Sequence, residues 1–174
     1  LGIGIRFAFT LYQKATELRT ELEARTEEEI RTLLINQNQK VAILPTRFTL
    51  IRGKSEVLGV GVLNILGSDS WFYINVSCAN WINASNPNMV RTCAYFAENS
   101  TQVLYANASV RILNNGYYVL PVAIIAPKSV EAGIYVINAY VCAAQAPARP
   151  QGCAAGNIEK MYDKQLHKIF VEVP

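Results

Sequence analysis

The first 34 residues constrain this chain most, because they are typical of a helix much longer than a small domain is wide. The stretch contains no proline, and its only glycines, Gly2 and Gly4, lie at its start. As a helix it would extend roughly 50 Å at about 1.5 Å per residue. Apolar residues recur at the spacing of one helix face, namely Leu11, Ala15, Leu18, Leu22, Ile30 and Leu33. We therefore expect a long N-terminal helix that lies on the surface or is covered from outside the chain.

A second pattern in the first ten residues supports an alternative. Apolar residues alternate there with glycine, alanine and arginine, a period of two that is typical of a strand. The alternating apolar residues are Ile3, Ile5, Phe7 and Phe9, and those between them are Gly2, Gly4, Arg6 and Ala8. In this alternative the chain begins as a strand, and only residues 11–35 or so form a helix.

Charge is concentrated at the N-terminus. Residues 1–40 hold six basic and six acidic residues, whereas Asp69 is the only charged residue between Leu58 and Val90. The net charge of +3 is too small and too dispersed to indicate a nucleic-acid partner. We expect a charged N-terminal rod followed by a polar but mostly uncharged body.

Beyond residue 40 the hydrophobic period changes from that of a helix to that of strands. Seven or eight short strands follow one another with no helix between them, which is typical of an antiparallel β-sandwich. The predicted strands are 48–51, 57–65, 71–78, 92–97, 103–113, 117–125, 134–142 and 166–173. Residues 79–90 are predicted as a loop, and Asn115-Gly116 between two strands predicts a hairpin.

The run from Glu131 to Tyr135 matches the acid-x-Gly-x-Tyr approach to the penultimate strand of such a sandwich. In that corner the tyrosine hydroxyl bonds back to the backbone of the turn. Tyr135 could also be an ordinary strand aromatic. Ile137 stands two residues later, where antibody domains have cysteine, so no antibody-type core disulfide is expected.

The chain has four cysteines, Cys78, Cys93, Cys142 and Cys153, and none is part of a Cys-x-x-Cys pair. With a single histidine a zinc site is not expected, so we predict two disulfides and an oxidising compartment. Three connectivities are possible. Cys78–Cys93 with Cys142–Cys153 is favoured, because each of these pairs flanks a loop-like segment.

Four Asn-x-Ser/Thr sequons occur within residues 75–109, at Asn75, Asn83, Asn99 and Asn107. Beside paired cysteines they indicate a glycosylated, extracellular surface. The simpler alternative is that asparagine, serine and threonine are common in loops.

Catalytic residues, metal ligands and cofactor sites are not expected. His167 is the only histidine, which leaves little material for a Ser-His-acid triad. The run from Arg52 to Ser55 resembles the end of a phosphate-binding loop, but Phe48 stands where that loop needs glycine. We expect a protein that is not an enzyme.

The apolar start, Leu1 to Tyr12, is interrupted by Arg6 and is shorter than the ~20 residues that span a bilayer. It has no small-residue cleavage site of a signal peptide. Because the chain begins with leucine, we interpret it as a processed product or a trimmed chain. Contact with a membrane is expected only before assembly.

A long N-terminal helix followed by a disulfide-bonded, sequon-rich sandwich is similar to the mature subunits of archaeal type IV-like pili. The resemblance rests on the apolar start, the corner at Tyr135, the sequons and the closing strand Ile169–Val173. It implies that helices form a filament core coated by immunoglobulin-like, often glycosylated domains. The chain departs from the family in its early charges, since family helices are apolar almost all round for twenty or more residues.

The resemblance implies two domains, an assembly segment at 1–38 and an immunoglobulin-like sandwich at 39–174. The chain would be the structural subunit of an extracellular pilus-like filament, a homopolymer that adheres to surfaces or to an envelope layer. Its predicted subunit interface consists of Leu1, Ile3, Ile5, Phe7, Phe9, Leu11, Ala15, Leu18 and Leu22.

Two alternatives remain open. In the first, the chain is a membrane-anchored, stator-like protein whose sandwich grips an envelope layer. In the second, filaments form by donor-strand exchange, with Ile3–Phe9 completing the sandwich of a neighbouring subunit.

Overall fold

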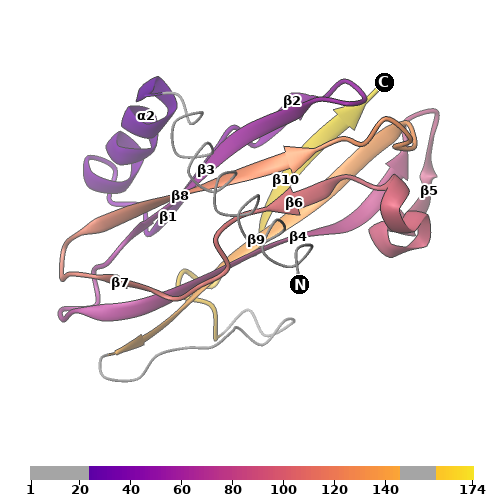
Figure 1. The fold of residues 1–174 in the computed structure, drawn as a ribbon. Coiled ribbons are helices and arrows are strands. Elements are labelled where there is room, and N and C mark those ends of the chain that lie inside the picture. The colour runs from indigo at the N-terminus through magenta and orange to yellow at the C-terminus, as the bar shows by residue number, and fades with distance from the viewer. Residues whose placement is uncertain (1–23, 146–159) are drawn as a thin grey trace, which may run out of the picture.

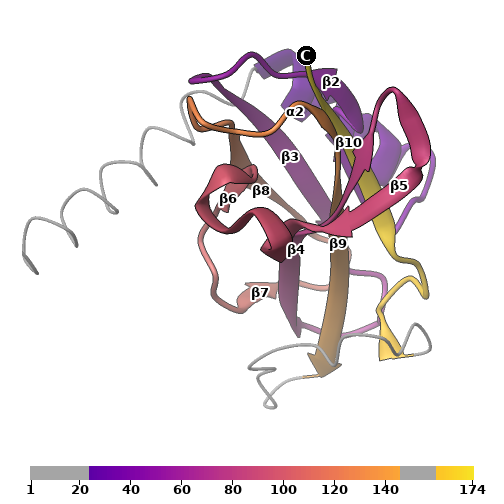
Figure 2. The same ribbon diagram turned by 90° about the vertical axis from the view of Figure 1, so that its right-hand side faces the viewer.

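The computed structural model describes residues 24–145 and 160–174, and the protein is mainly β (Figure 1). Two sheets pack face to face as a sandwich, and the α-helix of the described residues, α2 (Ala24–Ile35), lies on the outside of one sheet. Figures 1 and 2 place α2 and β5 at opposite ends of the sandwich.

The smaller sheet has four strands and the larger one six. In spatial order the smaller sheet contains β1 (Val41–Leu44), β3 (Ser55–Leu63), β8 (Tyr117–Ile125) and β6 (Gln102–Leu104). The larger sheet contains β2 (Arg47–Thr49), β10 (His167–Val173), β9 (Gly133–Gln145), β4 (Ser70–Asn83) and β5 (Asn86–Thr92), and β7 (Val110–Ile112) also pairs with β4. All pairs are antiparallel except β2 with β10.

This strand order is that of an immunoglobulin-like sandwich. The order β1-β3-β8-β6 corresponds to strands A, B, E and D, and β10-β9-β4-β5 corresponds to G, F, C and C′. After the cis peptide between Leu44 and Pro45, the chain leaves β1 and joins the other sheet as β2.

The core fills the space between the two sheets, because alternate residues of each strand point inward. Its largest contributions come from β3, β4, β8, β9 and β10. The inward side chains include Leu58, Val60, Val62, Phe72, Ile74, Val122, Ile124, Ile137, Val141, Ile169 and Val171. Along the predicted strands 71–78 and 166–173, buried and less buried positions alternate, whereas residues 120–124 of β8 are buried throughout.

The prediction of one long N-terminal helix is wrong. The helix that the structure describes has twelve residues and ends at Ile35, before the polar run 36–39 in which Asn38 adopts a φ of 54°. Four consecutive amide side chains offer nothing to bury, and a left-handed residue ends the helical path. The residues before Ala24 lie outside the described part of the chain.

α2 packs against the sandwich of its own molecule. For these residues, the expectation that something outside the chain covers the apolar helix face is therefore wrong. Ile30 and Leu34 are 0% exposed and form a second apolar cluster with Ala42 and Leu63. Leu34, which the predicted stripe omitted, is thus a main contact, and Leu33 is only partly buried.

The predicted number of strands, seven or eight, is also wrong, since the described residues contain ten. Residues 79–90 are not a loop. The Asn83 side chain accepts hydrogen bonds from the backbone N–H of Ser85 and Asn86, which closes a tight turn between β4 and β5. Pro87 is tolerated because β5 is an edge strand. The predicted strand 92–97 is wrong as well, since Thr92 ends β5 and residues 93–97 lie in a 3₁₀ helix, η1 (Cys93–Asn99).

The predicted hairpin at Asn115-Gly116 is wrong, although the turn exists. Asn115 has a φ of 63°, and Gly116 N–H bonds the Leu113 carbonyl at 2.8 Å. The preceding strand, β7, pairs with β4, whereas β8 pairs with β3, so the turn carries the chain from one sheet to the other. The predicted strand 103–113 likewise divides into β6 and β7, which belong to different sheets.

Candidate assembly site

All nine predicted interface residues, Leu1 to Leu22, lie outside the described residues. The structure shows instead where their segment joins the sandwich. α2 begins at Ala24 and packs across the outer side of β1 and β3, and only residues 36–40 separate it from β1. The candidate site is therefore the side of the sandwich formed by α2, β1 and the start of β10.

Gly61 of β3 is what lets α2 approach so closely. A Cβ atom added at Gly61 would lie 2.3 Å from Ile30 Cγ2 and 2.9 Å from Leu34 Cδ1. Only a residue without a side chain fits beneath the helix at this position. Gly61 therefore has a packing role in β3.

β1 is the outer strand of the four-stranded sheet. Leu63 N–H bonds the Lys40 carbonyl at 2.9 Å, and the register pairs Val41 with Val62. Because the bonded pairs of an antiparallel ladder alternate, the backbone groups of Ala42 and Leu44 face β3, whereas those of Val41 and Ile43 face away. Within 24–145 and 160–174 no strand pairs with this side of β1.

Two grooves follow this edge. The inner groove, about 530 Å³, lies between β1 and the segment that leads into β10, and its lining includes Gln39, Val41, Ile43, Thr46, Asp163 and His167. The outer groove, about 610 Å³, lies between α2 and β1 and is lined by Arg25, Glu28, Glu29, Thr32, Leu33 and Leu44. Leu33 lines both.

The polar wall of the inner groove contains a pair that the sequence analysis missed. Asp163 Oδ2 lies 2.5 Å from His167 Nε2, and their side chains are 9% and 20% exposed. The two residues are four apart, but Asp163 lies in a turn and His167 begins β10, so no helical periodicity could have indicated the contact. The histidine that was judged insufficient for a triad thus pairs with a carboxylate at the start of β10.

Tyr162 holds this wall in place. Its hydroxyl donates to the Leu63 carbonyl at 2.6 Å and accepts from Ile65 N–H at 3.1 Å. Its ring packs edge-on against Phe72 with centroids 5.0 Å apart. Burial raises the pKa of the Tyr162 hydroxyl, which further favours its protonated, donating form. The segment before β10 is thereby tied to β3, and the inner groove has a fixed side.

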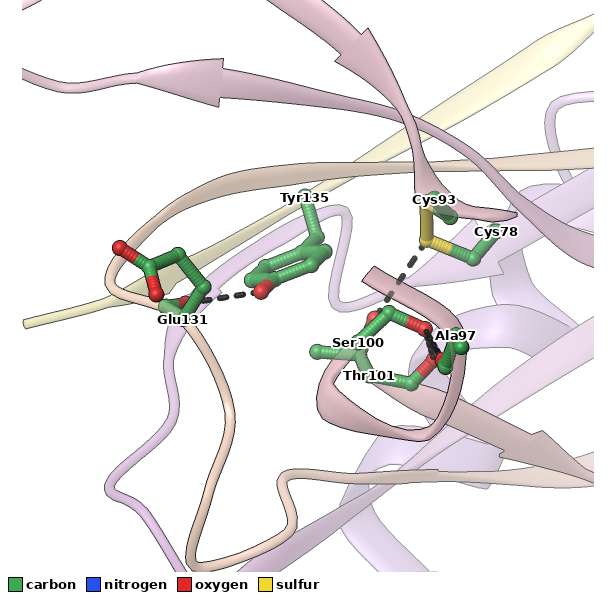
Figure 3. Close-up of a disulfide and its surroundings, with 7 residues drawn as sticks. All are labelled: Cys78, Cys93, Ala97, Ser100, Thr101, Glu131 and Tyr135. Carbon is green, nitrogen blue, oxygen red and sulfur yellow. Dashed lines mark hydrogen bonds between the residues drawn. A yellow bond between two sulfur atoms is a disulfide. The ribbon is translucent and has the colours of Figure 1, made fainter. Parts of the chain in front are cut away.

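At the far end of the sandwich a disulfide joins Cys78 of β4 to Cys93 of η1 (Figure 3). This confirms the first of the two predicted pairs. Thr101 Oγ1 donates to Cys78 Sγ at 3.5 Å, so the segment after η1 also contacts the crosslink. Cys142 takes part in a disulfide as well, and its predicted partner Cys153 lies outside the described residues.

The tyrosine corner is confirmed. Tyr135 is 0% exposed, and its hydroxyl donates to the Glu131 carbonyl at 2.8 Å (Figure 3). Burial, followed by the nearby Glu131 charge, raises the pKa of Tyr135 to about 12. Trp81 Nε1 donates to the Ala132 carbonyl at 3.0 Å, and a Cβ at Gly133, with a φ of 151°, would lie 2.1 Å from that nitrogen. The corner therefore requires glycine at this position.

The four sequon asparagines differ in accessibility. Asn99 and Asn107 are exposed, and Asn107 Oδ1 accepts the Tyr73 hydroxyl at 2.5 Å. Asn83 is half-buried in its turn, and Asn75 is half-buried in β4, where it pairs with Tyr140 of β9. Glycosylation stays a prediction, and the structure makes Asn99 and Asn107 the most accessible acceptors.

The described residues contain no cluster of three or more histidine, cysteine or acidic side chains that could hold a metal ion. Nor does any helix in residues 24–145 and 160–174 have the length and apolar character needed to cross a bilayer.

No protein-family model and no curated protein matches this chain. Solved structures resemble it distantly. The PapD-like domain 7 of human CEP192 is 11% identical, with a TM-score of 0.46, over 77% of this chain and 83% of that one. The class 5 fimbriae chaperone CfaA is 12% identical, with a TM-score of 0.41, over 77% of this chain and 56% of its own. The E. coli chaperone DraB is 12% identical, with a TM-score of 0.40, over 77% of this chain and 55% of its own. The chain spans about half the length of the two chaperones, and the likeness concerns the sandwich alone.

Proposed function

We propose that this chain is the structural subunit of an extracellular filament that assembles through the apolar segment preceding α2. The protein would bind copies of itself and would not be an enzyme. The predicted interface, from Leu1 to Leu22, supplies the adhesive surface, and the sandwich forms the body that the filament displays.

The observation that supports this most is the attachment of α2. Two of its side chains, Ile30 and Leu34, are completely buried against the sandwich, and five residues connect its end to β1. A segment that polymerises just before Ala24 is therefore joined to the sandwich through a docked helix. Force on the segment passes directly to the folded domain, as a filament subunit requires.

Apolar burial supplies the driving force. At about 25 cal/mol per Å² of apolar surface removed from water, neighbours that cover several such side chains would contribute many kcal/mol per subunit. Immobilisation of the subunits offsets part of this gain. A segment of one copy that binds a different surface of the next gives a heterologous, open contact, which builds a filament instead of a closed ring.

An extracellular location agrees with the disulfide and the exposed sequons. Cys78–Cys93 would not persist in a reducing cytosol, and Asn99 and Asn107 are accessible for glycans. Both features would protect the displayed sandwich.

The test compares the oxidised full chain with a truncated chain that lacks residues 1–22. We expect filaments of the full chain in electron micrographs and in sedimentation, and a folded monomer from the truncated chain. Near-UV circular dichroism checks that both sandwiches are native. A full chain that stays monomeric at high concentration, or a truncated chain that polymerises equally well, would overturn the proposal.

A further inference from the structure

We propose that the outer edge of β1, which no described strand pairs with, is the acceptor site of the filament, and that it binds residues Ile3–Phe9 of a second copy as an added strand. This inference rests on the proposed function and identifies the surface that receives the polymerising segment. The site comprises the outward backbone groups of Val41 and Ile43 together with the inner and outer grooves on either side of them.

The backbone of β1 has outward-pointing hydrogen-bonding groups that can pair with an added strand. The N–H and C=O groups of Val41 and Ile43 point away from β3, and no backbone hydrogen bond of the described residues uses them. Their side chains face the core, and both residues are only 6% exposed. Among the described residues these backbone groups have no partner, and pairing with an extended segment would satisfy them.

On the same side of the molecule, the larger sheet also has a strand edge that no described strand pairs with. β2 pairs with β10 only from Phe170 to Glu172, so the first part of β10, at His167 to Ile169, has no partner there among the described strands. The inner groove lies between this part of β10 and β1. An added strand would therefore have β1 on one side and the first part of β10 on the other.

The two grooves match a two-sided segment. Side chains of a strand added beside β1 alternate between the two faces of the sheet. One face holds the outer groove, with Leu33 and Leu44, and the other holds the inner groove, with Asp163 and His167. Residues 2–9 have the corresponding two-sidedness: Ile3, Ile5, Phe7 and Phe9 on one side, and Gly2, Gly4, Arg6 and Ala8 on the other.

The sizes and charges of the side chains in residues 2–9 determine which side of the added strand faces which groove. The large apolar side chains enter the outer groove, where Leu33 and Leu44 provide apolar contact. The glycines and Ala8 then face the inner groove and leave space for Arg6, whose guanidinium approaches the carboxylate of Asp163. Arginine and a largely buried carboxylate form a favourable charge-assisted contact.

The experiment places a photo-crosslinking residue at Gln39, an exposed position that lines the inner groove beside β1. Oxidised full-length copies carrying it are labelled with ¹⁵N, mixed with unlabelled wild-type chain, assembled and irradiated. We expect crosslinked peptides that join ¹⁵N residue 39 to unlabelled residues 3–9.

A matched pair of variants on α2 tests the groove itself. Leu33→Glu places a charge in both grooves, whereas Ile35→Glu changes a neighbour that is 47% exposed and lines neither. Leu33→Glu should lower the crosslink yield at least about tenfold, which corresponds to 1.4 kcal/mol or more, and Ile35→Glu should leave it unchanged. If Leu33→Glu does not fold, a peptide of residues 1–10 added to wild-type subunits should shorten the filaments, and the same peptide with Ile5→Glu and Phe7→Glu should not.

The outcomes separate the two proposals. Filaments whose crosslinks from residue 39 miss residues 3–9 overturn the acceptor site but leave the filament function intact. Crosslinks to residues 3–9 of the same ¹⁵N copy also overturn it, because the segment then completes its own sandwich. A full chain that never polymerises overturns the filament function, and the acceptor site with it.

Discussion

The Ile30 side chain of α2 lies directly over Gly61 of β3, where a Cβ atom would come within 2.3 Å of Ile30 Cγ2. The contact fixes the helix on the sheet. It also brings Leu33 of the helix near Leu44 of β1, and these two residues line the outer groove together.

Gly61→Val should therefore displace α2. The added side chain collides with Ile30 and Leu34, and overpacking of this kind typically costs about 1–3 kcal/mol. Urea unfolding should show the loss of stability, and filament yield should fall because the segment is no longer held at the domain. Ile35→Ala, at an exposed position of the same helix, should change neither quantity, and a native filament yield from Gly61→Val would mean that the position of α2 does not matter for assembly.

Phe7→Glu and Leu18→Glu should each abolish filaments while the sandwich still folds. A charge at either position would have to be desolvated in the subunit contact without a partner, which costs several kcal/mol. Electron microscopy and sedimentation measure assembly, and near-UV circular dichroism measures folding. Glu17→Gln, which alters a charge beside the apolar stripe, is the control and should assemble. Normal filaments from both glutamate variants would remove this segment from the mechanism.

The sequence predicted those parts of the fold in which local pattern and tertiary burial coincide. Phe72, Ile74 and Val76 recur at every second position because β4 has one face in the core. The acid-x-Gly-x-Tyr run predicted the corner because its hydrogen bond joins Tyr135 to Glu131, only four residues earlier in the sequence. Cys78 and Cys93 were paired correctly because the loop between them is short.

The failures share a different cause, since each depended on contacts between residues distant in the sequence. The turn at Asn115 has the same local conformation whether the strands on either side pair with each other or join different sheets. The buried Asn64 stabilises the second arrangement by donating to the Ile112 carbonyl at 2.8 Å. The docking of α2 on its own sandwich was similarly hidden, because it depends on Gly61, 26 residues beyond the end of the helix. The inner groove beside β1 could not be foreseen, because it arises only when the segment before β10 returns past β1.

Tyr135→Phe should reduce both the stability of the sandwich and its sensitivity to alkali. The hydrogen bond from the hydroxyl to the Glu131 carbonyl contributes about 1 kcal/mol, and its loss leaves that carbonyl without this donor. The pKa of Tyr135 is raised from 10.0 to about 12 in the folded protein. The folded state therefore holds the proton more tightly, so this stabilisation is complete below pH 10 and is lost as the pH rises to about 12.

Urea unfolding at pH 8 and at pH 11 checks this prediction. Wild type should lose more stability between the two pH values than Tyr135→Phe does. Tyr105 and Tyr162, whose pKa values burial also raises, remain in both proteins and provide the common background. Equal pH dependence in the two proteins would show that the Tyr135 proton does not contribute to the stability.

Replacing the disulfide by Cys78→Ser with Cys93→Ser should lower the stability of the sandwich without preventing assembly. The crosslink closes a loop with a sequence separation of 15, for which chain entropy predicts about 3 kcal/mol. It joins β4 to η1, at the opposite end of the sandwich from α2 (Figures 1 and 3). Thermal unfolding should show a lower midpoint, and filaments formed below that midpoint should have normal yield and appearance, because the α2 side is unchanged. Loss of filaments from a folded double variant would mean that the end of the sandwich bearing η1 takes part in the contact between subunits, which the proposed site on β1 does not allow.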